Sequence, residues 1–128
     1  MIVGVGVDAV EIGRFAESLA RTPSLADRLF TDGERAYADR AAGRGRTQRL
    51  AARFAAKEAV LKAMGQGLGA CGFHDIEVVR DEETSVPSVA LHARAAELAV
   101  EHGVRVWHLS LTHTDETAIA YVVAEGEG

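Results

Sequence analysis

The sequence predicts an α+β fold: one compact domain, residues 1–128, with a mainly antiparallel sheet packed against a long alanine-rich helix. Helical and strand patterns alternate irregularly along the chain, which disfavours a doubly wound parallel sheet. The chain closes with two alternating segments, 105–114 and 117–125, separated by two residues, as is typical of a hairpin. A helix expected over about 47–64 is apolar almost all round, which indicates burial.

The elements are expected in a simple order. Residues 2–8, IVGVGVD, form a first strand, and the two-residue period places Gly4, Gly6 and Asp8 on one face and three valines on the other. We expect the valine face to meet the core and the glycine face to stay bare. The later elements are a helix over 10–21, a turn, a capped helix over about 32–40, a loop over 41–48, the long helix, strands over 73–81 and 88–92, a helix over 93–104 and the hairpin.

Composition bounds the class of protein. The 128 residues are 48% apolar and 26% charged, which suits a globular domain that needs no disulfide. The net charge of −5 argues against general nucleic-acid binding, and the lone Cys71 cannot form an internal disulfide. No apolar run approaches the ~20 residues of a membrane span. The chain start lacks a basic region before its apolar residues, so it indicates a strand and not a signal peptide, and the cytoplasm is the default location.

The long helix carries charges that need an explanation. Its uncharged arc consists of small residues and should pack closely: Ala52, Ala55, Ala56, Ala59, Val60 and Ala63. On the opposite arc Glu58 lies between Phe54 and Leu61, four residues before Lys62. A surface pair of Glu58 with Lys62 would contribute only ~0.2–0.5 kcal/mol. A carboxylate between two large apolar side chains needs a stronger partner, such as a cation or a charged ligand.

Asp8 is the natural second carboxylate, because it ends the glycine face of the first strand. If the helix packs by that strand, Asp8 and Glu58 converge, and two carboxylates with open positions suit Mg²⁺ completed by phosphates. Arg53, Lys57 and Lys62 would then bind phosphate oxygens. A helix N-cap is an alternative role for Asp8, and the two roles can coexist.

Other candidates carry weaker signals. The glycines of 65–72 could cradle a phosphate, or simply end the long helix and start a turn. His113 lies at a strand end, where a structural role is more common than a catalytic one. The basic residues Arg14, Arg21 and Arg28 form either a solvated face or a docking site for an acidic partner. Histidine and cysteine spacings match no zinc site.

Three segments together resemble one family. VGVGVDAVEIGRF, RFAAKEAVLKAMG and HLSLTHTDETAIAYVV are similar, in order and spacing, to the motifs of the holo-[acyl-carrier-protein] synthases, the small stand-alone members of the 4′-phosphopantetheinyl transferase superfamily. The resemblance implies transfer of phosphopantetheine from coenzyme A to a serine of apo acyl carrier protein in fatty acid biosynthesis, with release of adenosine 3′,5′-bisphosphate. Which carrier protein is the natural acceptor stays open.

The resemblance also implies roles for individual residues. Asp8 and Glu58 would hold Mg²⁺, and Lys62 would neutralise the coenzyme A diphosphate and the leaving oxygen. The base is either Glu58 or a metal-bound water. The other expected contacts are Arg53 and Lys57 to phosphates or in ion pairs, Gly65, His113 and Thr114 to coenzyme A, and Arg14 and Arg21 to the carrier protein. Small members form homotrimers with active sites at subunit interfaces. A non-catalytic coenzyme A-binding module, or a purely structural helix contact, remains an alternative.

Overall fold

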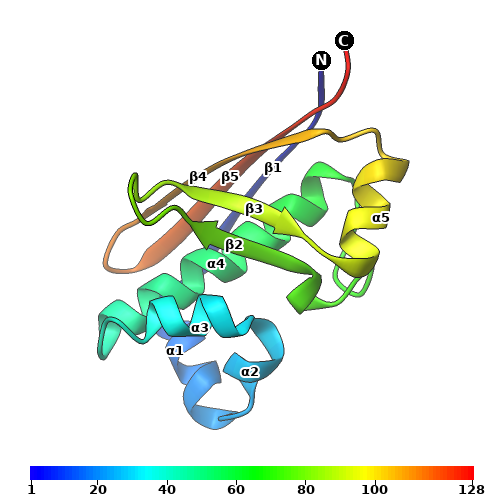
Figure 1. The fold of residues 1–128 in the computed structure, drawn as a ribbon. Coiled ribbons are helices and arrows are strands. Elements are labelled where there is room, and N and C mark those ends of the chain that lie inside the picture. The colour runs from blue at the N-terminus through cyan, green and yellow to red at the C-terminus, as the bar shows by residue number, and fades with distance from the viewer.

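The computed structural model describes all residues, 1–128, as a three-stranded sheet, a central helix and smaller elements around that helix (Figure 1). Every strand pair is antiparallel, in a sheet of order β1-β5-β4 and a separate β2–β3 hairpin, so the predicted α+β class is confirmed. The bounds are β1 Ile2–Glu11, α1 Ile12–Arg21, α2 Leu25–Leu29, α3 Asp32–Ala38, α4 Arg44–Ala63, η1 Phe73–Asp75, β2 Ile76–Arg80, β3 Pro87–Leu91, α5 Ala93–Glu101, β4 Val106–His113 and β5 Thr117–Glu125.

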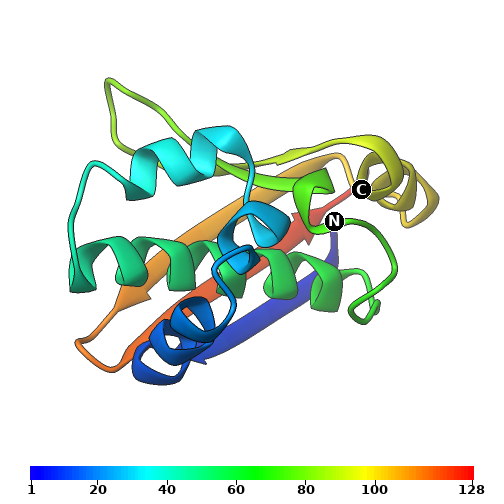
Figure 2. The same ribbon diagram turned by 90° about the horizontal axis from the view of Figure 1, so that it is seen from below.

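The helix α4 organises the molecule. It crosses the inner face of the sheet, where it packs on β1 and β5, and α1, α3 and β2 pack on its other sides (Figures 1 and 2). All six residues of the predicted uncharged arc are buried. One core surrounds its C-terminal half with β2 and α5, and a second surrounds its N-terminal half with α1, α2 and α3. The termini lie side by side, joined by hydrogen bonds between Met1 and Gly126. No helix combines the length and apolarity needed to cross a bilayer.

Several element boundaries differ from the expected ones. The turn expected before residue 32 contains the short helix α2, and α4 begins at Arg44, inside the loop expected over 41–48. The strand β1 continues to Glu11, which is the N-cap of α1, so the N-cap role for Asp8 is wrong. The expected cap of α3 is Thr31, whose hydroxyl accepts from the Glu34 N–H at 3.2 Å.

The prediction for the two faces of β1 is also wrong. The valines are half-exposed, with Val5 at 49%, and the glycine face is the one that meets the core. A Cβ built on Gly6 would lie 1.9 Å from the Ala59 carbonyl oxygen, and one on Gly4 would lie 1.9 Å from that of Ala63. The alanine-rich helix approaches the strand backbone so closely that only glycine fits between them. Strand alternation identifies two faces, but it does not say which face a flat helix surface will choose.

Candidate functional site

Asp8, Glu58 and Lys62 come together where β1 passes the C-terminal half of α4. The glycine–alanine contact brings the strand and the helix close enough for this. Lys62 Nζ donates to Asp8 Oδ1 at 2.9 Å and to the Val7 carbonyl at 3.2 Å. The Asp8 side chain is only 12% exposed, whereas Lys62 is 54% exposed and reaches in from the surface. Glu58 lies beside Asp8 on the helix side, and both residues line the same hollow. The predicted convergence of these two carboxyl groups is therefore seen in the structure.

Glu58 keeps its proton to a higher pH than an ordinary carboxyl group, because its pKa is raised. Burial, followed by the hydrogen bond to Asp8 and its negative charge, raises the pKa of Glu58 from 4.5 to about 7, and Lys62 only partly opposes this shift. The same Asp8 carboxylate raises the pKa of Lys62. Ionisation of Glu58 beside the Asp8 carboxylate is disfavoured, and a further positive charge would favour it. The pair is therefore poised to exchange a proton for a cation near neutral pH.

We expect Glu58 to titrate near pH 7 in the metal-free protein, and Asp8→Asn to lower its pKa because the neighbouring negative charge is removed. Carboxyl ¹³C NMR measures this directly. The sign for stability follows from linkage: between about pH 4.5 and 7 the folded protein holds a proton that the unfolded chain has released, so this group lowers the unfolding free energy as the pH rises. An unshifted Glu58 resonance would contradict the hydrogen-bonded pair.

A hollow of about 360 Å³ opens beside this pair. Asp8 and Glu58 form its acidic side, and Arg14 and Ser18 line it from α1. Phe15 and Phe54, stacked with ring centroids 5.5 Å apart, supply an apolar wall. Arg14, which is predicted to bind an acidic partner, thus borders the same hollow as the two carboxyl groups. Arg21, the other predicted docking residue, lies in the exposed last turn of α1.

Lys57 does not face a ligand. Its side chain is completely buried, and its Nζ forms an ion pair with Glu34 Oε1 at 2.7 Å. The predicted contact of Lys57 with a phosphate is therefore wrong, and the ion pair is its role. Burial lowers the pKa of the Lys57 ammonium, while the charge of Glu34 opposes that shift. A charged group so deeply buried requires a partner inside the protein.

A second hollow, of about 350 Å³, lies on another side of α4 and is rich in guanidinium groups. Arg49 and Arg53 sit 4.4 and 4.3 Å from the centroid of the Tyr37 ring, and Arg80 sits 5.2 Å from it. Arg53 is only 5% exposed, burial lowers its pKa, and its Nε has no hydrogen-bond partner. A buried guanidinium with a free N–H, beside two further cations, can receive an anion.

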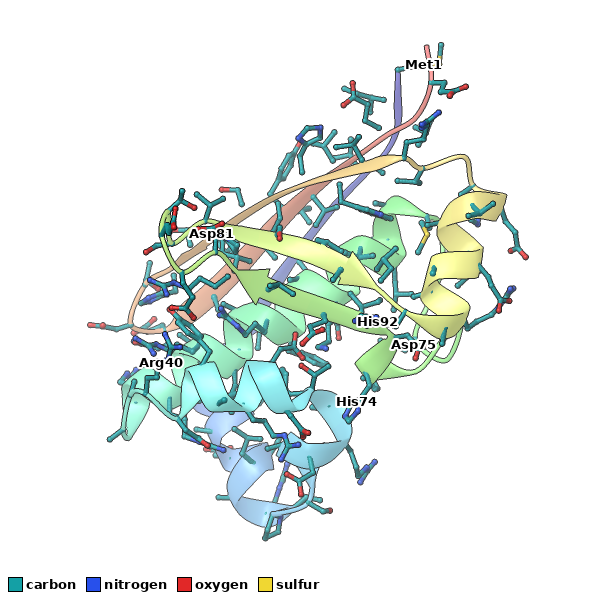
Figure 3. The ribbon with its side chains drawn as sticks, viewed as in Figure 1. Met1, Arg40, His74, Asp75, Asp81 and His92 are labelled. Carbon is teal, nitrogen blue, oxygen red and sulfur yellow. The ribbon has the colours of Figure 1, made fainter.

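The surroundings of this hollow set its charge. His113 lines it from the end of β4, across from Arg53 on the helix. Arg40 lies 5.6 Å from the Tyr37 ring centroid and pairs with Glu82 at 3.0 Å, and Figure 3 shows Arg40 and the turn residue Asp81 at the same end of the molecule. Arg49 and Arg53 donate to backbone carbonyls and have no carboxylate partner. The hollow therefore keeps an excess of positive charge.

The predicted coenzyme A contacts thus separate into two places. Arg53 and His113 share the basic hollow, while Lys62 belongs to the carboxyl pair. Glu58 follows Arg53 by five residues, which is about 140° around a helix of 3.6 residues per turn. Gly65 follows α4 in the left-handed conformation at φ 67°, and the Thr114 hydroxyl accepts from two N–H groups of the β4–β5 turn. The site of one chain is therefore divided between two sides of α4.

Sequence reasoning missed four residues: Glu34, which pairs with the buried Lys57, and three residues of the basic hollow, Tyr37, Arg49 and Arg80. Arg49 precedes Arg53 by one helical turn, so helical spacing could have found it. The other three come from α3 and β2, whose approach to α4 no local pattern reveals. No group of three or more histidine, cysteine or carboxylate side chains forms a metal cage, so a cation at the Asp8–Glu58 pair would need ligands from elsewhere.

Comparison with known proteins identifies the family of this chain. The family model of the 4′-phosphopantetheinyl transferase superfamily matches residues 4–122. The chain is 50% identical to the holo-[acyl-carrier-protein] synthase of Frankia casuarinae over 97% of this chain and 98% of that protein. It is 47% identical to that of Clavibacter sepedonicus over 100% and 99%.

Solved structures give the same result. A holo-(acyl-carrier-protein) synthase from Bacillus anthracis, in complex with CoA (3′,5′-ADP), superimposes with a TM-score of 0.81 at 36% identity and 99% coverage of both chains. The Neisseria meningitidis holo-[acyl-carrier-protein] synthase gives 0.86 at 32% identity, covering 98% of this chain and 99% of that one. The chain belongs to the 4′-phosphopantetheinyl transferase superfamily.

Proposed function

We propose that this protein is a holo-[acyl-carrier-protein] synthase, which transfers 4′-phosphopantetheine from coenzyme A to a serine of apo acyl carrier protein. The observation that carries the proposal is the convergence of Asp8, Glu58 and Lys62 beside an open hollow that Arg14 borders. Full-length relatives at 47–50% identity carry this name. Such substrates suit the cytoplasmic location expected from the sequence.

The reaction needs positioning and charge neutralisation more than covalent chemistry by the protein. The serine oxygen bonds to the phosphorus that bears the pantetheine, the bond from that phosphorus to the bridging oxygen breaks, and adenosine 3′,5′-bisphosphate leaves with that oxygen. Lys62 is half-exposed, and its ammonium, which donates to Asp8 and to the Val7 carbonyl, would turn toward the diphosphate when coenzyme A binds. Glu58 is the proposed acceptor of the serine proton, because its pKa, about 7 in the metal-free protein, suits a general base at neutral pH.

The residues present fit Mg²⁺. The donors are two carboxylates without sulfur or imidazole, and the raised pKa of Glu58 beside Asp8 indicates that their combined negative charge favours a counter-charge. Asp8 and Glu58 would hold the ion, and phosphate oxygens of coenzyme A would complete its ligands. When bound, Mg²⁺ would neutralise the charge that develops on the diphosphate.

The basic hollow is proposed to hold the adenosine bisphosphate end of coenzyme A. Arg49, Arg53 and His113 offer guanidinium and imidazole N–H groups to a phosphate. Since this hollow and the carboxyl pair lie on different sides of α4, one coenzyme A molecule would engage the basic hollow of one subunit and the carboxyl pair of the next. This accounts for the homotrimer with interfacial active sites that the sequence resemblance implies.

The outer face of the sheet supplies a surface for such assembly. Val3, Val5, Val7 and Tyr121 form a contiguous apolar patch, since β1 pairs with β5 and Val7 lies opposite Tyr121. Each of these side chains is 42–50% exposed. A patch of this kind on a sheet face is typical of a protein–protein contact, and a second copy of the chain is the proposed occupant.

We expect Val5→Lys to dissociate the assembly and to reduce transfer, because it places a charge in the centre of the patch. Size-exclusion chromatography with light scattering measures the mass. The matched control is Val100→Lys on α5, where the side chain is already 78% exposed and lies away from the sheet. A wild-type protein that is monomeric at assay concentration would contradict the assembly.

The test of the function is transfer of labelled phosphopantetheine to apo carrier protein, followed by intact-mass spectrometry with and without Mg²⁺. A mass increase of one phosphopantetheine that depends on Mg²⁺ is expected. The competing candidate, a non-catalytic module, would bind coenzyme A in calorimetry and leave the carrier protein unmodified. A structural protein would show no heat with coenzyme A and Mg²⁺.

We expect Arg14→Glu to raise the KM for carrier protein by about 10-fold while the KM for coenzyme A changes little, because the guanidinium faces the acidic partner at the rim of the hollow. Steady-state kinetics with each substrate varied separately measures both values. Arg105→Glu, an exposed cation beyond both hollows, is the control. Equal KM values for Arg14→Glu and wild type would move the docking surface elsewhere.

A further inference from the structure

The buried ion pair between α4 and α3 is completely satisfied. Lys57 Nζ donates to Glu34 Oε1 at 2.7 Å, to the Phe73 carbonyl at 2.8 Å and to the Ile76 carbonyl, so all three ammonium protons have acceptors. Both side chains are 0% exposed. A lysine so enclosed contributes no charge to the surface or to either hollow.

Glu34 extends this connection to other elements. Its Oε1 also accepts from the Thr31 N–H at 2.9 Å, and its Oε2 accepts from the Val78 N–H at 2.9 Å. Thr31 in turn donates to Glu77 Oε2 at 2.8 Å. The network reaches the surface at His92, 3.0 Å from Glu77 Oε1, and Figure 3 shows His92 next to Asp75. The middle of α4 is thereby tied to α3, η1 and β2.

Apolar packing surrounds α4, but on the sheet side, where Glu58 meets Asp8, it consists mostly of small residues. On the sheet side, alanines and backbone of α4 meet the glycines of β1 and the inward face of β5, which carries three alanines and one valine: Ala118, Ala120, Val122 and Ala124. Small side chains make a shallow surface with few ridges to interlock. The buried Lys57 ammonium donates to three fixed acceptors, and because these hydrogen bonds are directional they restrict the rotation of α4. Buried polar groups are best documented in this role of fixing register.

Glu58 directly follows Lys57 and depends on that rotation. A helix with its side chains has a radius of about 5–6 Å, so a rotation of ~10° moves a side-chain tip by about 1 Å. A displacement of this size at a reacting group can cost about 100-fold in rate. The carboxyl pair, built half on α4 and half on β1, is sensitive to it because only one of its members would move.

We propose that Lys57 and Glu34 are positioning residues for the metal-binding carboxyl pair: the buried ion pair fixes the rotation of α4 at which Glu58 meets Asp8. The inference rests on the proposed function, and it assigns the first lysine of the KEAVLK segment to orientation of the helix. Neither residue touches the substrate. Replacing both residues should weaken Mg²⁺ binding and slow turnover. It should not change the binding of the adenosine bisphosphate end of coenzyme A.

The decisive variant is Lys57→Met combined with Glu34→Gln. It removes both charges and leaves an amide oxygen on the α3 side chain as an acceptor for a backbone N–H, whereas Lys57→Met alone would strand a buried carboxylate. Two measurements apply: the Mg²⁺ dissociation constant, by calorimetry with saturating coenzyme A and no carrier protein, and the KM for coenzyme A. We expect the Mg²⁺ dissociation constant to rise at least ~10-fold, as it does when residues that orient the ligands of a metal site are replaced. The KM for coenzyme A should stay within about twofold of the wild-type value.

The matched control is Arg46→Met. Arg46 pairs with Asp39 at 2.8 Å and so also joins α4 to the end of α3, but on the surface and eleven residues earlier in the chain. It should leave both constants unchanged. An equal rise in Arg46→Met would show general loosening of α4 and would overturn the assignment, as would a folded double variant with the Mg²⁺ affinity of the wild type.

A second variant keeps the test informative if the double variant fails to fold. Glu34→Asp retains the charge and shortens the side chain by one methylene, so a rise of at least about threefold in the Mg²⁺ dissociation constant is expected in a folded protein. No change would overturn the proposal. Wild-type protein assayed in parallel separates the two levels of inference: absence of transfer by wild type refutes the proposed function, and its presence leaves the positioning claim to the variants.

Discussion

Glu58→Gln should abolish phosphopantetheine transfer, lowering kcat by at least about 100-fold, and Asp8→Asn should do the same. Each variant keeps the size of the side chain and removes a negative charge from the pair that is proposed to hold Mg²⁺. In Glu58→Gln the group placed to accept the serine proton is lost as well, and general base catalysis alone is worth about 10²–10⁴-fold. Initial rates at several Mg²⁺ concentrations measure the effect.

The stability of these variants separates chemistry from folding. The metal-free variants should be at least as stable as the wild type at neutral pH, because the raised pKa of Glu58 means that its ionised form is disfavoured in the fold. Glu101→Gln, an exposed glutamate on α5, serves as the control and should transfer at the wild-type rate. Full activity of Glu58→Gln at ordinary Mg²⁺ would refute the site assignment.

Much of the site could be predicted because its signals are local. The alanine arc of α4 follows from helical periodicity, and Glu58 stands out because a carboxylate between Phe54 and Leu61 has no local partner of sufficient strength. Asp8 follows from the alternation of β1. The structure brings the two segments together as expected, but through the glycine face that was expected to stay bare, and Lys62 bonds to Asp8.

What could not be predicted depends on approach between segments. Lys57 resembles a surface cation until α3 brings Glu34 to its Nζ, and a lysine that is 0% exposed is too uncommon to expect without that partner. The basic hollow likewise needs Tyr37 from α3 and Arg80 from β2 beside Arg53. Residues of the same charge thus acquire opposite roles, one cation inside the core and another in a ligand hollow.

The faces of β1 illustrate the same limit. Three valines opposite two glycines predict a valine core by hydrophobicity alone. In the structure, α4 packs closely on the glycine face instead, and this contact buries a row of alanines on α4 and another on β5. The apolar area buried in this way outweighs the area that the valines would have buried. The valines are left on the outer face, where the proposed neighbouring subunit would cover them.

Gly6→Ala should therefore be among the most destabilising single-methyl changes in this protein. The added Cβ would lie 1.9 Å from the Ala59 carbonyl oxygen and 3.0 Å from the Ala63 backbone nitrogen, and both are rigid helix backbone that no side-chain rotation can relieve. Overpacking of a core costs about 1–3 kcal/mol and occasionally more, and a backbone clash belongs at or above the upper end. Urea unfolding of the metal-free protein measures the free energy of unfolding.

The matched control is Gly13→Ala in the first turn of α1, where an added Cβ meets nothing within 4 Å. The same methyl group should stabilise there by up to about 1 kcal/mol, because alanine is the better helix former. If α4 must shift to accommodate Gly6→Ala, Glu58 moves away from Asp8, so the variant that remains folded should also bind Mg²⁺ more weakly. A Gly6→Ala protein as stable as the wild type would show that the helix and strand do not approach this closely.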